Sequence, residues 1–160
     1  MKIYIGTDHV GFDLKEKLKV YLKELGYEVE DRGSFNFVGT DDYPDFIKPV
    51  AEAVALDKGS FGIILGGSGQ GEAMCANRIS GIRAAVFYGQ EVPTGTIDEE
   101  GHKSADTFEI IKLVREHNDA NILSIGTRFV TEDEAKFAVE LFLSTKFSGE
   151  ERHIRRINKF

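Results

Sequence analysis

The chain has 160 residues, of which 41% are hydrophobic and 29% charged, a composition that fits one compact domain with a sizeable apolar core. Its formal net charge of −7 at pH 7 argues against general nucleic-acid binding, which uses a basic excess to neutralise phosphates. The chain has one cysteine, Cys75, no apolar stretch near the roughly 20 residues of a membrane span, and no signal-peptide pattern at residues 1–5, so we expect a cytoplasmic protein without an internal disulfide or a membrane segment.

The hydrophobic pattern alternates between the two-residue period of strands and the 3.6-residue period of helices. In chain order it predicts a strand at 2–6, a helix at 14–25, a weak strand at 28–31, a helix at 45–56, a strand at 63–65, a helix that ends near 79, a strand at 82–88, a helix from about 104 to 116, a strand at 121–125, a helix that opens with a capping box at 131–134, and a short basic helical segment at 150–160. Because strands alternate with helices, we predict a parallel five-stranded sheet covered by helices on both faces.

The polar stretch 89–103 is the exception to this regular pattern. It contains Pro93, Gly95 and Gly101 and is long for a connection inside an α/β unit. A loop of this length is either functional or merely tolerated.

Residues 66–71 read Gly-Gly-Ser-Gly-Gln-Gly and follow the buried third strand directly, with Glu72 at the start of the next helix. A strand that passes through glycines into a helix directs unpaired backbone N–H groups and the positive end of the helix dipole at one point, which predicts an anion site. No Lys-Ser or Lys-Thr pair follows, so this is not a Walker loop, and the third glycine comes one position early for GxGxxG. Close packing alone is the alternative, and Glu72 could be an ordinary first-turn acid.

Ligands of parallel α/β sheets bind beyond the carboxyl ends of the strands, where three predicted strands of this chain carry polar residues. The first strand leads to Asp8 and His9, the third to the glycine turn, and the fifth to Arg128. Asp8 is also a favoured helix N-cap, so a capping role and a binding role both remain open. His117 precedes the fifth strand and should lie at the opposite end of the sheet, unless it serves a neighbouring subunit or follows a bent connection.

The C-terminal segment gathers three cations. On a helix Arg152, His153 and Arg156 share one face, and two guanidiniums with an imidazole suit a phosphate. The alternatives are a solvated basic face or a nucleic-acid arm, although such a cluster in a chain of net charge −7 favours a focused anion site. We interpret the lone Cys75 as a core residue.

Seven motifs occur in order along nearly the whole chain, at residues 6–12, 42–44, 66–72, 76–78, 81–84, 115–120 and 152–153. In this order they resemble the ribose-5-phosphate isomerase B family, which includes galactose- and allose-6-phosphate isomerases. The resemblance implies a three-layer, Rossmann-like α/β/α fold and an aldose–ketose isomerase that uses neither a metal nor a cofactor. It also implies a homodimer or a dimer of dimers, in which a single domain, 1–160, reaches the partner subunit through a C-terminal segment at about 148–160.

The catalytic base follows from the same resemblance. One branch of the family uses a cysteine at the end of the third strand, where this chain has Gly66, and the other uses a glutamate after the glycine turn, which Glu72 matches. Two effects on the basicity of Glu72 oppose each other, since a helix N-terminus lowers the pKa of a carboxyl group whereas burial raises it.

The remaining roles are carried over by position. Ser68 with the turn amides of Gly67, Gly69 and Gly71 would hold the enediolate, and His117 would assist ring opening. Asp8, His9, Tyr43 and Asn118 would bind the sugar. The phosphate would bind to His9, Arg128, Arg152, His153 and Arg156, of which the last three would come from the partner subunit.

The substrate that the resemblance favours is ribose 5-phosphate, converted to ribulose 5-phosphate in the pentose phosphate pathway. The stretch 89–103 makes this region longer than in the typical member, so another aldose phosphate, such as allose 6-phosphate, galactose 6-phosphate or a tetrose phosphate, is an alternative. A non-catalytic sensor of phosphosugars is the alternative from another class.

Overall fold

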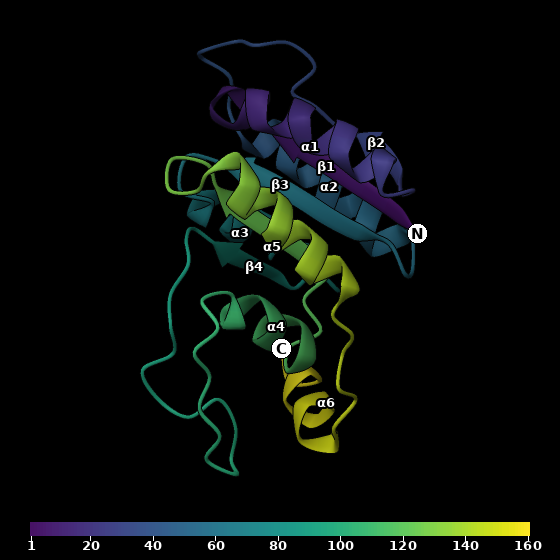
Figure 1. Ribbon diagram of the computed structural model, residues 1–160. Coiled ribbons are helices and arrows are strands. Elements are labelled where there is room, and N and C mark those ends of the chain that lie inside the picture. The colour runs from purple at the N-terminus through teal and green to yellow at the C-terminus, as the bar shows by residue number, and fades with distance from the viewer.

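The structure, a computed structural model, describes residues 1–160 and is built around one parallel sheet with the strand order β2-β1-β3-β5-β4 (Figure 1). The strands are β1 (Lys2–Thr7), β2 (Glu28–Asp31), β3 (Phe61–Gly66), β4 (Ala84–Phe87) and β5 (Ile122–Gly126). The helices are α1 (Phe12–Glu24), α2 (Pro44–Leu56), α3 (Gln70–Ala76), α4 (Glu109–Glu116), α5 (Glu132–Ser144) and α6 (Glu151–Ile157), with a 3-10 turn η1 (His9–Gly11) before α1. The predicted five-stranded, Rossmann-like sheet is confirmed.

Helices cover both faces of the sheet and bury its central strands. A core of 17 residues lies on the side of α1, α4 and α5, and a core of 10 residues lies on the side of α2 and α3. Successive side chains of a strand point to opposite faces, so in β3 Ile63 and Leu65 enter the first core and Ile64 enters the second. This is why β3 reads as an uninterrupted apolar run in the sequence.

The register of the sheet brings three strand ends to one edge. Thr7 at the end of β1 pairs with Leu65, and Gly66 at the end of β3 pairs with Gly126 at the end of β5. The segments that follow these three strands therefore begin side by side.

Two helix boundaries differ from the prediction. The predicted extension of α3 to residue 79 is wrong, because the helix ends at Ala76 and single turns lead to Gly81, whose φ is +83°. The predicted start of the fourth helix near 104 is also wrong, because α4 begins at Glu109. Side-chain turns hold the chain before it, since Ser104 Oγ accepts a hydrogen bond from the amide of Asp106, and Asp106 in turn accepts from the amide of Phe108.

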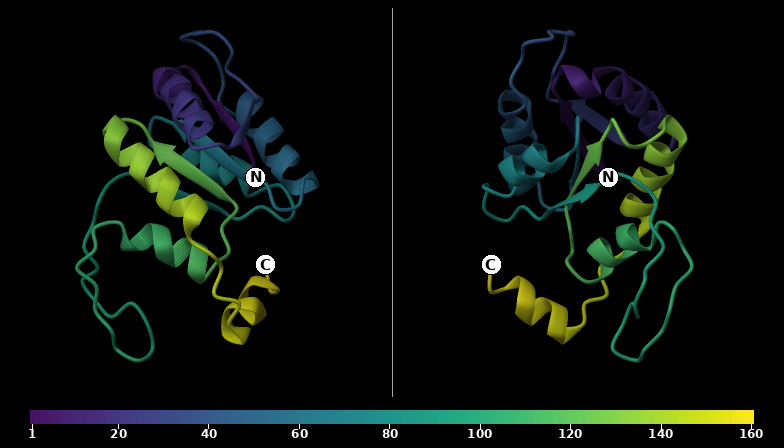
Figure 2. Two further views of the ribbon diagram at one scale, coloured as in Figure 1. Left: turned by 45° about the vertical axis from the view of Figure 1, so that its right-hand side comes forward. Right: turned by 90° about the vertical axis from the view of Figure 1, so that its left-hand side faces the viewer.

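The lower end of the molecule carries α6 and the long connection between β4 and α4 (Figure 2). The connection is closed at its base by a hydrogen bond from the Glu91 amide to the Thr107 carbonyl. Its tip is a turn in which Asp98 accepts from the amides of Glu100 and His102, each at 3.0 Å. None of the helices is long and apolar enough to cross a membrane.

Candidate active site

The glycine turn lets the backbone lie against three neighbouring groups. Gly69 has a left-handed φ of +74°, and a Cβ there would lie 3.1 Å from the amide nitrogen of Gly126. A Cβ at Gly67 would meet the guanidinium carbon of Arg128 at 3.0 Å, and one at Gly71 would meet the Tyr43 hydroxyl at 2.9 Å. The turn thus places Arg128 and Tyr43 directly beside the backbone that links β3 to α3.

Glu72 fills the space that a side chain at the end of β3 would need. A Cβ at Gly66 would overlap Oε1 and Cδ of Glu72 and would lie 2.8 Å from its Cγ. Glu72 is only 5% exposed, although it lies in the first turn of α3. The carboxylate therefore folds back under the glycine turn, and Gly66 is the residue that makes this possible.

Burial decides the basicity of Glu72. Loss of water around the carboxylate raises its pKa above the ordinary value for glutamate, and the nearby charge of Asp8 acts in the same direction. The backbone amide of Glu72 and the charge of Arg128 oppose this rise without cancelling it. Desolvation therefore outweighs the effect of the helix N-terminus on this carboxyl group. A raised pKa suits a group that must accept and return a proton.

Asp8 and His9 stand on the first strand end, beside Glu72. Asp8 is buried and caps the 3-10 turn η1, where it accepts a hydrogen bond from the Val10 amide at 3.0 Å, whereas the N-cap of α1 itself is Gly11. Its charge also reaches Glu72, which leaves it at the edge of the same site. Asp8, His9 and Asp41 each have a side-chain atom of a type that can bind a metal ion, and these three atoms lie within 4.8 Å of one another.

We call the residues at this edge of the sheet the turn-end group: Asp8, His9, Tyr43, Gly67, Ser68, Gly69, Gly71, Glu72 and Arg128. Ser68 and Arg128 are exposed, and the side chain of Arg128 forms no ion pair within the chain. Cys75 packs half-buried against the second core, and burial raises the pKa of its thiol.

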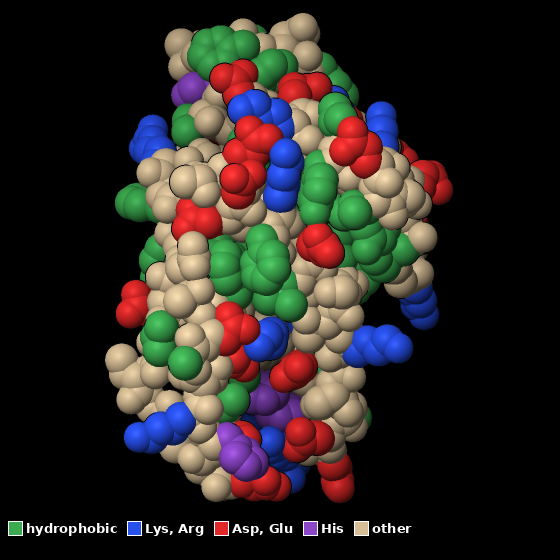
Figure 3. Space-filling model, in the orientation of Figure 1, with side chains coloured by type: hydrophobic (Ala, Val, Ile, Leu, Met, Phe, Trp, Pro, Cys, Tyr) green, Lys and Arg blue, Asp and Glu red, His purple; other side chains and the backbone are tan.

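The other predicted site residues lie at the opposite end of the sheet. His117 ends α4 ahead of β5, and its ring stacks on that of His153 with centroids 4.3 Å apart. His153 is 4% exposed, and burial, then the charges of His117 and Arg152, lower its pKa. We call His117, Asn118, Arg152, His153 and Arg156 the helix-end group. Histidine side chains are visible near both ends of the face in Figure 3.

Arg152 is already paired within the chain. Its Nη1 lies 2.5 Å from a carboxylate oxygen of Glu99, which belongs to the tip of the long connection, and its Nε lies 2.8 Å from Glu150. Arg156, one turn further along α6, is exposed and forms no ion pair in the chain. The contact with Glu99 joins residues 53 positions apart, and no local pattern indicates it.

Asp119 fixes the segment that carries His117 and Asn118. It has a left-handed φ of +46°, which aspartate tolerates better than most residues. Arg83 donates to its carboxylate at 2.8 Å and to its carbonyl at 2.8 Å, and Arg115 donates to the other carboxylate oxygen at 2.9 Å. Arg83, Arg115 and Asp119 lie within motifs at 81–84 and 115–120, but the sequence patterns predict no role for them.

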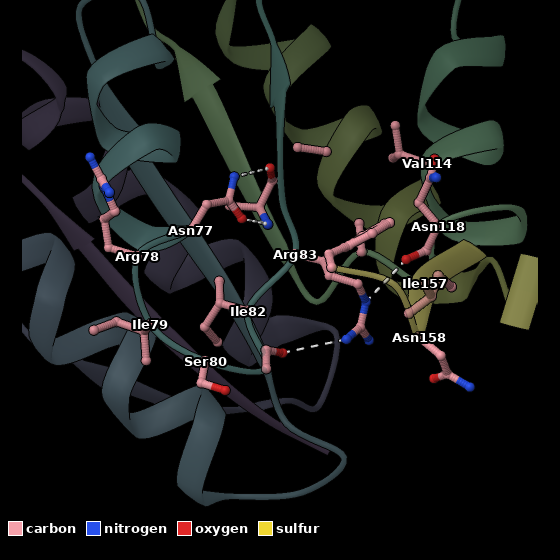
Figure 4. Close-up of a pocket in the computed structure, with 15 residues that line it drawn as sticks. Asn77, Arg78, Ile79, Ser80, Ile82, Arg83, Val114, Asn118, Ile157 and Asn158 are labelled. Atoms are coloured by element: carbon pink, nitrogen blue, oxygen red, sulfur yellow. Dashed lines mark hydrogen bonds between the residues drawn. The ribbon is translucent and has the colours of Figure 1, made fainter. Parts of the chain in front are cut away.

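An open cavity of about 910 Å³ adjoins the helix-end group, between the turn after α3, the start of β4 and the end of α6 (Figure 4). Figure 4 shows Arg83, directly before β4, reaching toward Asn118 on the opposite wall of the cavity. Glu72 does not line this cavity. Within one chain, this cavity and the buried carboxylate of Glu72 therefore belong to different ends of the sheet.

Comparison with known proteins points to one family. The family model described as "Ribose/Galactose Isomerase" matches residues 3–97 and 104–160. Ribose-5-phosphate isomerase B of Mycobacterium tuberculosis (strain H37Rv) is 37% identical over 158 residues, which cover 99% of this chain and 86% of that protein. A structure of ribose-5-phosphate isomerase B from Mycoplasma genitalium with bound ribulose-5-phosphate has a TM-score of 0.84 at 34% identity, covering 99% of this chain and 92% of that one. The enzyme of the same name from Clostridium thermocellum also has a TM-score of 0.84, at 40% identity, covering 99% of this chain and 94% of that one. Residues 98–103, which contain Glu99, fall outside the family match.

Proposed function

This chain belongs to the ribose/galactose isomerase family, and from that premise we propose that it converts ribose 5-phosphate to ribulose 5-phosphate with Glu72 as the base. The observation that supports the assignment of the base is the fit between Gly66 and Glu72. A carboxylate that occupies the place of a strand-end side chain, with a raised pKa and the glycine turn beside it, is arranged for proton transfer next to a carbonyl.

The reaction moves hydrogen within one molecule. In the open-chain aldehyde, Glu72 removes the proton from C2, and the electron pair of that C–H bond forms the C1–C2 double bond of an enediolate. The proton then returns to C1, while the proton of the C2 hydroxyl passes to O1, so the substrate is neither oxidised nor reduced overall. Ser68 and the amides of the glycine turn stabilise the negative charge that develops on oxygen.

Ring opening and phosphate binding use residues of both groups. In this proposal His117 assists ring opening, Asn118 and Asp8 contact the sugar hydroxyls, and Tyr43 borders the turn. His9 and Arg128 bind the phosphate from the turn-end side. Contacts to this remote group supply binding energy that orients the small sugar for reaction.

The separation of the two groups supports a composite site. One chain holds the turn-end group and the helix-end group at opposite ends of its sheet, so they cannot meet on one substrate within that chain. We infer a homodimer, or a dimer of dimers, in which the turn-end group of one subunit faces the helix-end group of its partner. The C-terminal segment at about 148–160 then carries Arg152, His153 and Arg156 across the interface.

Substitution of Glu72 by Gln tests this function. The amide keeps the size of the side chain but cannot accept the proton, so kcat should fall by about 10²–10⁴-fold, the usual contribution of a general base. Binding of ribose 5-phosphate, measured by calorimetry, should persist. The matched control is Glu52→Gln, because Glu52 is exposed on α2 and the charge change is the same.

The same assay separates the alternatives. A panel of ribose, allose, galactose and tetrose phosphates under identical conditions identifies another aldose phosphate by its kcat/KM. Binding without turnover on every member of the panel would instead favour a phosphosugar sensor. Undiminished turnover in the Glu72→Gln variant would remove Glu72 from the role of the base.

A further inference from the structure

Asp41 holds the side chain of His9 from a different part of the chain. It lies in the connection between β2 and α2, and its Oδ1 accepts a hydrogen bond from the backbone amide of His9 at 3.0 Å. The same oxygen lies 2.6 Å from Nδ1 of the His9 ring. An ionised carboxylate can only accept hydrogen bonds, so Nδ1 carries the proton in this contact.

The contact determines which ring nitrogen is free. Nε2 of His9 forms no hydrogen bond within the chain, and the ring also meets the edge of Phe37, with centroids 6.2 Å apart and planes at 89°. Asp41 and Phe37 together fix the plane of the imidazole. The nitrogen left for a ligand is Nε2.

Stability alone does not explain an aspartate at this position. The side chain of Asp41 is 9% exposed, and its second oxygen, Oδ2, is buried without a hydrogen-bond partner. A buried carboxylate oxygen without a partner costs free energy, and an asparagine would hold the His9 amide equally well without a charge. The arrangement is therefore better explained by what the carboxylate does to the ring.

We infer that Asp41 is a positioning residue that keeps Nδ1 of His9 protonated and directs Nε2 to the phosphate of the substrate. This inference rests on the proposed function, in which His9 binds that phosphate. An imidazole that lies between a carboxylate and a phosphate donates from both nitrogens, and the second proton comes from water or from the phosphate monoanion. Asp41 itself does not touch the substrate.

The test combines spectroscopy with kinetics on the full-length protein. In protein labelled with ¹⁵N-histidine, the ring signals of wild-type His9 should show a protonated Nδ1. In Asp41→Ala the neutral ring should instead carry its proton on Nε2, and KM for ribose 5-phosphate should rise about 10-fold while kcat stays within about 2-fold, the pattern of a lost charge-assisted contact in binding. Asp41→Asn keeps an oxygen acceptor without the charge, so it should retain the Nδ1 proton and raise KM about 3-fold. The control is Asp45→Asn, since Asp45 is exposed at the start of α2.

The outcomes separate this inference from the proposed function. A wild-type His9 whose neutral ring is protonated only on Nε2 would overturn the inference, as would an Asp41→Ala protein with an unchanged KM and an unchanged tautomer. If Asp41→Ala does not fold, Asp41→Asn decides: an unchanged KM for that variant also overturns the inference. If the wild type lacks isomerase activity, the ring spectra and a titration with inorganic phosphate still decide the role of Asp41, because neither needs turnover.

Discussion

The turn-end group and the helix-end group are held in place by different means. At the turn end, three strands stop in register, and the backbone itself shapes the site through glycines that admit Glu72, Tyr43 and Arg128. At the helix end, side chains position one another: His153 stacks on His117, two arginines clamp Asp119, and Glu99 pairs with Arg152. For the roles proposed above, backbone-built geometry suits the proton transfer by Glu72, which needs sub-ångström placement, whereas the contacts of Arg152 and Arg156 with a phosphate would tolerate adjustment.

We expect the largest effect from a substitution in the turn-end group, where the glycine backbone shapes the site. Gly66→Ala would place a methyl group on Oε1 of Glu72 and displace the carboxylate, and a displacement of about 1 Å can cost on the order of 10²-fold in rate. We expect kcat to fall by about that factor. The matched control is Gly95→Ala, because Gly95 has open space around its Cα and should lose no activity. An active Gly66→Ala enzyme would show that Glu72 is not the base in this position.

Mixing two inactive variants tests whether the turn-end group of one subunit and the helix-end group of its partner form one site. Glu72→Gln lacks a working turn end, and the double variant Arg152→Ala/Arg156→Ala lacks a working helix end. After random exchange of equal amounts, half of the dimers are mixed and each has one intact composite site, so about a quarter of the wild-type turnover should return. Mass spectrometry verifies the exchange, and a mixture that stays inactive after verified exchange would contradict the shared site.

The pH dependence contrasts the titrating groups of the two ends. Because the folded pKa of Glu72 is raised, its stability contribution is complete below the unfolded pKa and is lost as pH rises through the folded pKa. His153 has a lowered folded pKa, so its contribution is present above its unfolded pKa and is lost as pH falls through the folded value. Because a general base must be ionised to accept a proton, we also expect kcat/KM to fall on the acid side of its pH profile with an apparent pKa above the ordinary value for glutamate.

Thermal denaturation provides a second measurement of how the charge on Glu72 affects the protein. At pH 7 to 8 the melting temperature of Glu72→Gln should be equal to or above that of the wild type, because the variant buries no charge at this position. Any difference should disappear below about pH 4, where Glu72 is protonated in both the folded and the unfolded state. A wild type that is more stable than the variant at pH 8 would contradict a destabilising effect of the buried charge on Glu72.

The smallest effect concerns the exposed contact between the long connection and the helix end. Glu99 is 72% exposed, and exposed ion pairs contribute about 0–1 kcal/mol, so Glu99→Gln should lower KM for ribose 5-phosphate by at most about 5-fold as Arg152 becomes free for phosphate. Glu100→Gln is the control, since it removes the same charge from the same turn without a contact to Arg152. A raised KM in Glu99→Gln would show that Glu99 supports Arg152 instead of competing for it.

The two ends also differ in how well the sequence predicts them. Strands such as β1 and β3 and the capping box at Thr131 are encoded by neighbouring residues, so their patterns predict them. The turn end is equally predictable from local patterns, because all of its members except Tyr43 directly follow β1, β3 or β5. The strand order, in which β5 lies between β3 and β4, has no local signature.

Contacts between distant side chains lie beyond such patterns. His9 and Asp41 are 32 positions apart and Glu99 and Arg152 are 53 apart, and each pair is brought together only by the packing of whole elements. The early end of α3 and the late start of α4 depend on Gly81 and on the side-chain turns at Ser104 and Asp106, which compete with helical hydrogen bonds.

The overlap between position 66 and Glu72 also restricts how this protein can change over evolutionary time. If Glu72 is the base, as proposed above, a cysteine gained at position 66 while Glu72 remains would displace it, and loss of Glu72 first would leave no base. Under that proposal each substitution would be harmful alone and only the pair would yield another working arrangement, which is reciprocal sign epistasis. The choice between a glutamate and a cysteine is therefore expected to divide lineages deeply, with few intermediates between them.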